Sequence, residues 1–261
     1  MDRGLRSASR AFEHAFGRWR SWVVYCANPV KKVRARAFYR QFVVPGAVCF
    51  DIGAHMGDRT AQFLKLGAKV VAVEPQPALA AALERRYRRD PRVSVVAAAL
   101  GARAGRAPLA LDPLNLTVAT LSSDFIAAAG ASRGFRRVRW REQIDVEVTT
   151  LDALIERFGE PSFCKIDVEG FELAVLEGLS RPLAALSLEY LPAALAPAKG
   201  AIARLERLGP YRFNHSRGES MRLAVPYWVD AAAMCTALDR IPADDRAGDI
   251  YARLDEAQGN R

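Results

Sequence analysis

The feature of this sequence that most constrains its fold is a regular alternation of short apolar runs with helical segments, which begins at residue 47. The apolar runs are short and rich in β-branched or aromatic residues, as buried strands are. Strands that alternate with helices form a parallel sheet with right-handed crossovers. The strands predicted in this way are Ala47–Asp51, Lys69–Glu74, Val93–Ala97, Phe163–Asp167 and Leu183–Glu189, and the helices are Asp58–Leu66, Pro77–Arg88, Leu151–Phe158, Phe171–Leu176 and Lys199–Leu208.

Two parts of the chain are less regular. Between residues 102 and 148 the pattern predicts strands near Pro108–Leu111 and Ile144–Val148 and a helix near Ser122–Ala129. Leu114–Phe125 has no period, and an irregular loop of this length is expected to form a substrate lid. Late strands are predicted at Tyr211–Asn214 and Met221–Val225.

Positive charge is concentrated at the N-terminus. The first forty residues hold ten Lys or Arg against Asp2 and Glu13, which is +8 of the formal net charge of +9. We therefore predict a basic helical arm over residues 1–43, broken at Asn28-Pro29, and a single α/β domain over residues 44–261. The body lacks the basic surface of a nucleic-acid-binding domain, so no nucleic-acid partner is expected.

Aromatic residues recur at helical spacing in the arm, at Phe12, Phe16 and Trp19, with arginines between them. Three interpretations stay open: the aromatic face packs on the body or on a second subunit, it contacts a membrane surface, or the arm binds RNA. No apolar run is long enough to span a membrane, no export signal is recognisable, and the four cysteines form no CxxC pair. A cytoplasmic protein without disulfides or structural zinc is expected.

The loop Asp51–Thr60 (DIGAHMGDRT) has the pattern of a strand end, a glycine turn and a helix start. Gly53 and Gly57 suit a turn where the backbone approaches a ligand closely. Glu74 follows Asp51 by 23 residues and ends the next strand, where a carboxylate can accept hydrogen bonds from both ribose hydroxyls of an adenosine cofactor. The loop has no GxG, and its carboxylates would repel a pyrophosphate, so S-adenosylmethionine fits better than NAD.

These segments, with KIDVEGFELAVLEGL (Lys165–Leu179), resemble the FkbM family of S-adenosylmethionine-dependent methyltransferases from about residue 46 to 191. The resemblance implies the class I methyltransferase fold, which is Rossmann-like and has a mostly parallel seven-stranded sheet with helices on both faces. It also implies methylation of a small-molecule hydroxyl, on a sugar, a glycan or another natural product. The family commonly has Asn where this chain has His55. The cofactor-binding residues expected on this basis are Asp51, Gly53, Ala54, His55, Gly57, Thr60, Glu74 and Pro75.

The KIDVEG segment is expected beside the cofactor's methyl group, because its strand lies next to the one ending at Asp51 in the methyltransferase order. Lys165 and Asp167 point to one face of an otherwise apolar strand, where an unpaired charge is costly. Lys165, Asp167 and Glu169 are the candidate catalytic residues. Asp167 or Glu169 would orient or deprotonate the acceptor, or Lys165 and Asp167 would only pair with each other and shape the loop.

Other polar groups near this segment leave alternatives open. An alternative is a divalent-cation site formed by Asp167, Glu169 and Glu172. No further ligand is identifiable, so no metal is predicted. Glu189 and Tyr190 could reach the same pocket, whereas a lone His215 is more typical of an incidental residue. Competing functions are an RNA methyltransferase that uses the arm, an NAD-linked oxidoreductase, and a non-enzymatic recruitment module. Peripheral membrane contact through the arm and a homodimer are two further hypotheses that stay open.

Overall fold

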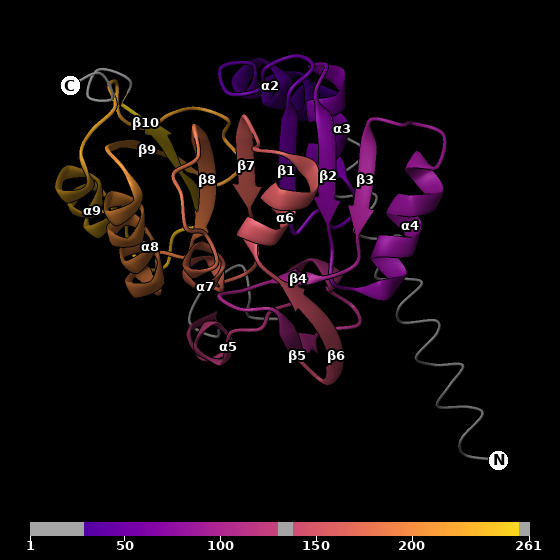
Figure 1. The fold of residues 1–261 in the computed structure, drawn as a ribbon. Coiled ribbons are helices and arrows are strands. Elements are labelled where there is room, and N and C mark those ends of the chain that lie inside the picture. The colour runs from indigo at the N-terminus through magenta and orange to yellow at the C-terminus, as the bar shows by residue number, and fades with distance from the viewer. Residues whose placement is uncertain (1–28, 130–137, 256–261) are drawn as a thin grey trace.

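The computed structural model describes residues 29–129 and 138–255, and its centre is a seven-stranded sheet with the order β3-β2-β1-β7-β8-β10-β9. The first five strands in that order are parallel to one another, and only β10 runs antiparallel to its neighbours β8 and β9. The predicted fold, a mostly parallel seven-stranded α/β sheet, is confirmed (Figure 1). The strands are β1 (Val48–Ile52), β2 (Lys69–Val73), β3 (Val93–Val96), β7 (Phe163–Ile166), β8 (Ala185–Tyr190), β9 (Tyr211–Arg217) and β10 (Gly248–Leu254).

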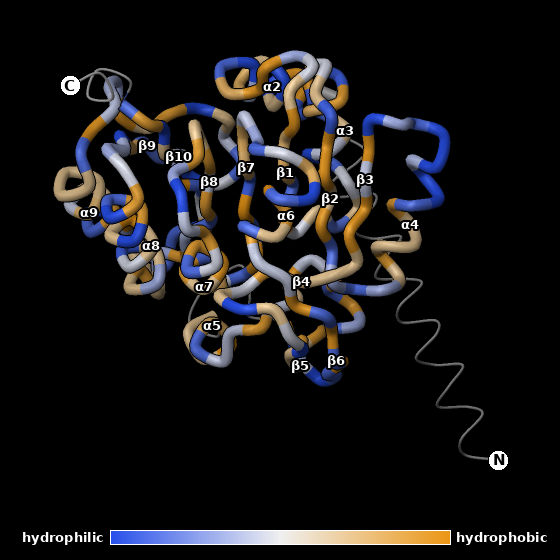
Figure 2. Tube along the Cα trace, viewed as in Figure 1, coloured by the Kyte–Doolittle hydropathy of each residue, from blue (hydrophilic) through white to orange (hydrophobic). Residues whose placement is uncertain are grey.

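Helices cover both faces of the sheet, because side chains of a strand alternate between its faces. On β1, Cys49 packs toward one face and Phe50 toward the other, and each belongs to a separate apolar cluster. Figure 2 shows apolar residues concentrated along the central strands. The helices are α2 (Pro29–Tyr39), α3 (Asp58–Lys65), α4 (Pro77–Tyr87), α5 (Ser123–Ala129), α6 (Leu151–Phe158), α7 (Glu172–Glu177), α8 (Leu195–Leu208) and α9 (Ala231–Asp239).

A second, three-stranded sheet lies beyond the carboxyl ends of the parallel strands (Figure 1). Its order is β4 (Ala99–Leu100), β6 (Glu142–Thr149) and β5 (Gly105–Leu111), with β6 in the centre. The short 3₁₀ helix η1 (Leu116–Val118) follows β5 and comes before α5. The two strands predicted in this part of the chain exist, but both are longer than predicted, and β4 adds a third.

The C-terminal part differs most from the sequence prediction. Met221–Val225 is not a strand; it is irregular chain tied to β9 by single hydrogen bonds such as Ala224 N to His215 O. The strand that completes the sheet is β10, which was not predicted. Asp249 and Arg253 interrupt its apolar character, and it is stabilised by pairing with β8 and β9 rather than by local pattern. Helix α9 was also missed.

Helix α2 is described from Pro29 onward and docks on the sheet through aromatic residues, while the predicted break at Asn28-Pro29 stays a prediction because Asn28 lies outside the described residues. Tyr39 is fully buried, with its ring centroid 5.1 Å from that of Phe63. The Phe42 ring stacks between Phe163 and Tyr251, at centroid distances of 5.0 and 5.5 Å. The arm residues Phe12, Phe16 and Trp19 lie outside the described residues, and the division into an arm and a domain at residue 43 stays a prediction.

The aromatic contact at Phe42 predicts a large effect on stability. Phe42→Ala removes a ring that is 7% exposed and leaves a cavity between two other rings, so the free energy of unfolding should fall by about 3–5 kcal/mol. Val33→Ala on α2 is the control, because Val33 is 57% exposed and its loss should change stability by less than about 0.5 kcal/mol. Urea unfolding measures both, and equal stability of the two variants would contradict the docking.

Candidate active site

The loop after β1 comes into direct contact with the loop after β7. Gly53 has φ +79°, and a Cβ built on it would lie 1.9 Å from the carbonyl oxygen of Asp167. The backbone N–H groups of Gly53 and Ala54 both donate to the carbonyl oxygen of Val73 at 2.9 Å. Glycine is therefore required here both by backbone conformation and by the close approach of two strand ends. The ends of β1, β2 and β7 meet at this point.

Glu74, directly after β2, is held as an acceptor at the edge of this loop. Its two carboxylate oxygens accept the backbone N–H of His55 and of Gln76, each at 2.9 Å, and the residue is 3% exposed. Burial raises the pKa of Glu74 to about 7, and these two N–H donors offset part of that effect. Each oxygen keeps a second lone pair, so the carboxylate can still accept from a ligand.

Asp51, at the end of β1, ties the strand to the following helix. Its Oδ2 accepts the backbone N–H of Thr60 at 2.8 Å and also the Thr60 hydroxyl. Burial raises the pKa of Asp51, and these hydrogen bonds act against the shift. Asp51 borders a cavity, whereas Thr60 is fully buried and, like Gly57, lines neither of the two cavities described next.

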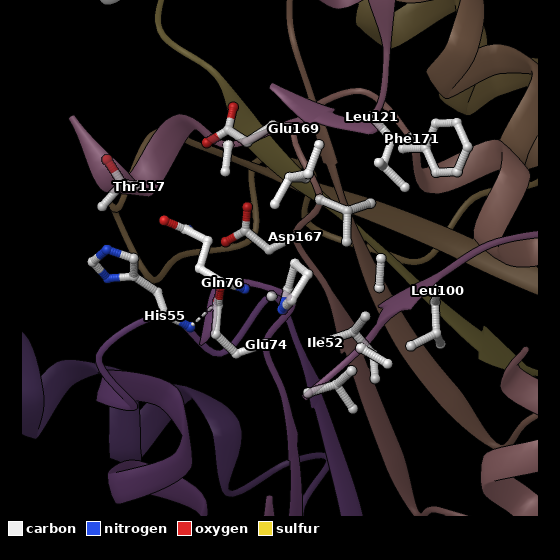
Figure 3. Close-up of a pocket in the computed structure, with 18 of the residues that line it drawn as sticks. Ile52, His55, Glu74, Gln76, Leu100, Thr117, Leu121, Asp167, Glu169 and Phe171 are labelled. Carbon is white, nitrogen blue, oxygen red and sulfur yellow. Dashed lines mark hydrogen bonds between the residues drawn. The ribbon is translucent and has the colours of Figure 1, made fainter. Parts of the chain in front are cut away.

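Two cavities meet at Gly53 and Asp167. The first, here called the apolar cavity, lies between Glu74, Leu100 and Phe171 (Figure 3). The second, here called the charged cavity, is lined by ionisable groups that include Asp51, Arg59, Lys165, Glu189 and Glu219. His55, Thr117, Asp167 and Glu169 line both cavities, so one elongated ligand with an apolar end and a charged end can fill them together.

The segment around η1 closes over the place where the two cavities meet. Leu116, Thr117, Ala119 and Leu121 line the apolar cavity. Gln76 Nε2 donates to the Leu116 carbonyl at 2.8 Å, and Thr120 Oγ1 donates to the Glu169 carbonyl at 2.7 Å. The irregular segment predicted as a lid therefore lies over the site and is fastened on both sides.

Lys165 and Asp167 form the predicted pair on one face of β7. Lys165 Nζ lies 2.7 Å from Asp167 Oδ2 and 3.6 Å from Asp249 Oδ1. Burial opposes the charge on Lys165, but the two carboxylates outweigh it and raise the lysine pKa well above its usual value. Burial alone raises the pKa of Asp167, but the Lys165 ammonium reverses this and lowers it. At neutral pH both groups are charged.

Glu169 and Glu189 join Asp167 in one group of carboxylates. One oxygen from each lies within 4.8 Å of the other two. Burial, and then the charges of neighbouring acids, raises the pKa of both glutamates well above the usual value. Glu172 is not in this group: its Oε1 accepts the N–H of Val168 at 3.1 Å and of Gly170 at 3.2 Å, so it caps the loop. The sequence analysis placed Glu172 with Asp167 and Glu169, whereas the third acid of the group is Glu189, which comes from the neighbouring strand β8.

A larger cleft of about 540 Å³ adjoins the site on the side of α7 and α8, and we call it the outer cleft. It touches the charged cavity at Glu189 and the apolar cavity at Phe171. Tyr190 is also in its wall. Among the residues that the structure describes, the ionisable groups that line it are the phenol of Tyr190 and four acids, Asp124, Glu172, Glu177 and Glu189.

Most residues expected at the cofactor line the two cavities: Asp51, Gly53, Ala54, His55, Glu74 and Pro75, together with the catalytic candidates Lys165, Asp167 and Glu169. His215 lies apart in β9, with Nδ1 3.3 Å from the Tyr190 hydroxyl. Sequence reasoning missed Gln76, Arg59 and Phe171. Each lies within or next to a motif already singled out: Arg59 in Asp51–Thr60, Gln76 directly after Glu74-Pro75, and Phe171 in Lys165–Leu179.

The family model described as "Methyltransferase FkbM domain" matches residues 51–195, which is more than half of the chain. Comparison with curated proteins finds no match. A solved TehB-like SAM-dependent methyltransferase from Corynebacterium glutamicum is 12% identical and has a TM-score of 0.49, covering 94% of this chain and 99% of that chain. A solved O-methyltransferase from Bacillus cereus in complex with SAH is 10% identical and has a TM-score of 0.44, covering 95% and 91%. Both are distant likenesses.

The close approach at Gly53 predicts a steric effect that a matched glycine lacks. Gly53→Ala places a methyl group against the Asp167 carbonyl, so overpacking should lower the free energy of unfolding by about 1–3 kcal/mol beyond the cost of the positive φ. Gly46→Ala is the control, because Gly46 has φ +82° and no atom within 4 Å of its added Cβ. Thermal or urea unfolding gives the difference, and equal losses in the two variants would refute the contact.

Proposed function

We propose that this chain, which belongs to the FkbM methyltransferase family, binds S-adenosylmethionine and transfers its methyl group to a hydroxyl of a small molecule. A sugar, a glycan or another natural product would be the acceptor. The observation that carries the proposal is the meeting of the apolar and charged cavities at Gly53 and Asp167. Family membership removes the alternative of an NAD-linked oxidoreductase.

The two cavities match the two ends of the cofactor. The apolar cavity suits the adenine ring, and Glu74 at its edge suits the two ribose hydroxyls, which can donate to its free lone pairs. The methionine end would occupy the charged cavity, where Arg59 and Lys165 can attract its carboxylate and the acids its ammonium group. In this placement the sulfonium lies near the shared residues Asp167 and Glu169.

The reaction would be an in-line displacement at the methyl carbon. The acceptor oxygen forms a bond to the methyl carbon, the carbon–sulfur bond breaks, and S-adenosylhomocysteine leaves with the electron pair. Asp167 and Glu169 would orient the hydroxyl, and one of these carboxylates would receive its proton. Holding the two reactants in line contributes more to the rate enhancement than the base does.

The outer cleft is the proposed path of the acceptor, because it reaches the carboxylates at Glu189. The described part of its lining has acids and no Lys or Arg, which disfavours a phosphorylated or otherwise anionic acceptor. This argues against RNA as the substrate and favours a neutral small molecule. Part of the basic arm lies outside the described residues, so membrane contact and a homodimer through the arm stay predictions. None of the described helices is long and apolar enough to cross a membrane.

Calorimetry with S-adenosylmethionine and S-adenosylhomocysteine tests the cofactor. Glu74→Gln should weaken both affinities by about 1–3 kcal/mol, because it removes a buried charged acceptor. Glu84→Gln on α4 is the control and should bind as wild type does, since Glu84 is exposed. No binding of either compound to the wild type would overturn the proposal.

The pH dependence gives a second readout of the same residue. The ionised Glu74 is the form that accepts from the ribose, and its pKa of about 7 in the ligand-free protein means that protons compete with the ligand below pH 7. Affinity should therefore be constant above pH 7 and fall roughly tenfold for each unit below it. Glu74→Gln should lose this step, and a step that persists in the variant belongs to another group.

The transfer step can be tested with ¹³C-methyl-labelled cofactor and a panel of neutral sugars and polyketides. We expect an O-methyl product, and Asp167→Asn should lower kcat by about 10²-fold or more while S-adenosylhomocysteine still binds. Glu84→Gln, on the exposed side of α4 and outside the cleft, is the control and should keep the wild-type kcat. An N-methyl product, no product at all, or full activity of Asp167→Asn would contradict the proposed acceptor chemistry.

A further inference from the structure

The carboxylates of Asp167, Glu169 and Glu189 converge on one point from two neighbouring strands. Asp167 and Glu169 lie in the loop after β7, and Glu189 lies near the end of β8. One oxygen of each is within 4.8 Å of the other two. Like charges at such distances in a partly buried site repel strongly, so the arrangement is costly unless the acids take up protons or a cation lies between them.

Glu169 supplies a second and separate observation. Its side chain is one of the three that converge, yet the residue is only 9% exposed. Its Oε2 is buried and receives no hydrogen bond from any residue of 29–129 or 138–255. A buried carboxylate oxygen without a donor is rare, because the loss of hydration is then uncompensated. The orphaned oxygen points to a ligand that residues 29–129 and 138–255 do not provide.

The positive groups nearby do not fill this role. Lys165 is shared between Asp167 and Asp249, at 2.7 and 3.6 Å. Arg59 is held by Asp58 and Glu219, each at 2.8 Å. Neither cation forms an ion pair with Glu169 or Glu189 among the described residues. One lysine therefore faces four acids, and a sulfonium would compensate only one further negative charge.

We propose that Asp167, Glu169 and Glu189 bind a hard divalent cation of the Mg²⁺ class. Carboxylate oxygens are the ligands such ions prefer, at about 2.0–2.1 Å for Mg²⁺. At this distance octahedral ligands lie about 3 Å apart when adjacent and about 4 Å apart when opposite, so oxygens within 4.8 Å of one another need only a small movement to share one ion. Asp167 can take part because only its Oδ2 is bound to Lys165.

The place of the ion gives it a function in the proposed reaction. Glu189 lines both the charged cavity and the outer cleft, so the ion would lie between cofactor and acceptor. Three protein ligands leave coordination positions open, and two neighbouring oxygens of an acceptor can occupy them. This part of the inference rests on the proposed function and narrows the acceptor to compounds with two adjacent hydroxyl or carbonyl oxygens. Binding of the ion to the three carboxylates does not depend on the proposed function.

The test uses Mn²⁺ as the probe on the full chain after treatment with EDTA. Calorimetry and electron paramagnetic resonance should show one saturable Mn²⁺ site in the wild type. Glu169→Gln and Glu189→Gln should each weaken Mn²⁺ affinity at least tenfold, since each removes a charged ligand. Mn²⁺ should also raise the melting temperature of the wild type but not that of Glu169→Gln.

Glu177→Gln is the matched control, because Glu177 lines the outer cleft but lies outside the converging group. It should keep its Mn²⁺ affinity within about twofold. No saturable Mn²⁺ binding to the wild type, or equal binding in all variants, would overturn the inference. S-adenosylhomocysteine binding is measured on the same samples: if it is present without Mn²⁺ binding, only this inference fails, and if Mn²⁺ binds alone, only the proposed function fails.

Discussion

The site depends on one close contact, between the α-carbon of Gly53 and the carbonyl oxygen of Asp167. A side chain on Gly53 would push the two loops apart, and they carry nearly every polar group of the site. The contact exists because β1 pairs with β2 on one side and with β7 on the other, all three parallel and in register. Three strand ends then meet at one edge, where the strand order turns back. The sheet thus fixes the distance between Glu74 and the KIDVEG carboxylates.

The same construction buries more negative than positive charge. Glu74 and Asp51 are satisfied by backbone N–H groups and a hydroxyl, whereas Asp167 relies on Lys165. Within residues 29–129 and 138–255, Glu169 and Glu189 have neither kind of compensation, and their pKa values are raised well above the usual range. Such groups are costly to the empty fold, and a positively charged ligand relieves that cost. A binding site of this kind is less stable than an apolar core of equal size.

The sequence predicted those parts of the site that local patterns mark. Asp51, Glu74 and Asp167 each end a predicted parallel strand, and parallel strands bring their ends together. Glu189 also ends a predicted strand, but Glu172 lay nearer in sequence and was grouped with the other acids in its place. Strand β10 was missed because its pairing with β8 and β9, not its own pattern, makes it a strand. Arg59 and Phe171 lie inside the two predicted motifs, but the sequence did not indicate that their side chains line the cavities.

The segment around η1 has a kinetic consequence. It is fastened at one end to Gln76, beside the β2 carboxylate, and at the other to the carbonyl of Glu169 in the β7 loop. A ligand that fills both cavities would contact this segment at Thr117, so the two hydrogen bonds would limit how far the segment can move aside during ligand exchange. In the proposed reaction the acceptor would arrive through the outer cleft, which residues 116–121 do not line. The two proposed reactants would then have separate routes, and this segment would hinder only the one that occupies both cavities.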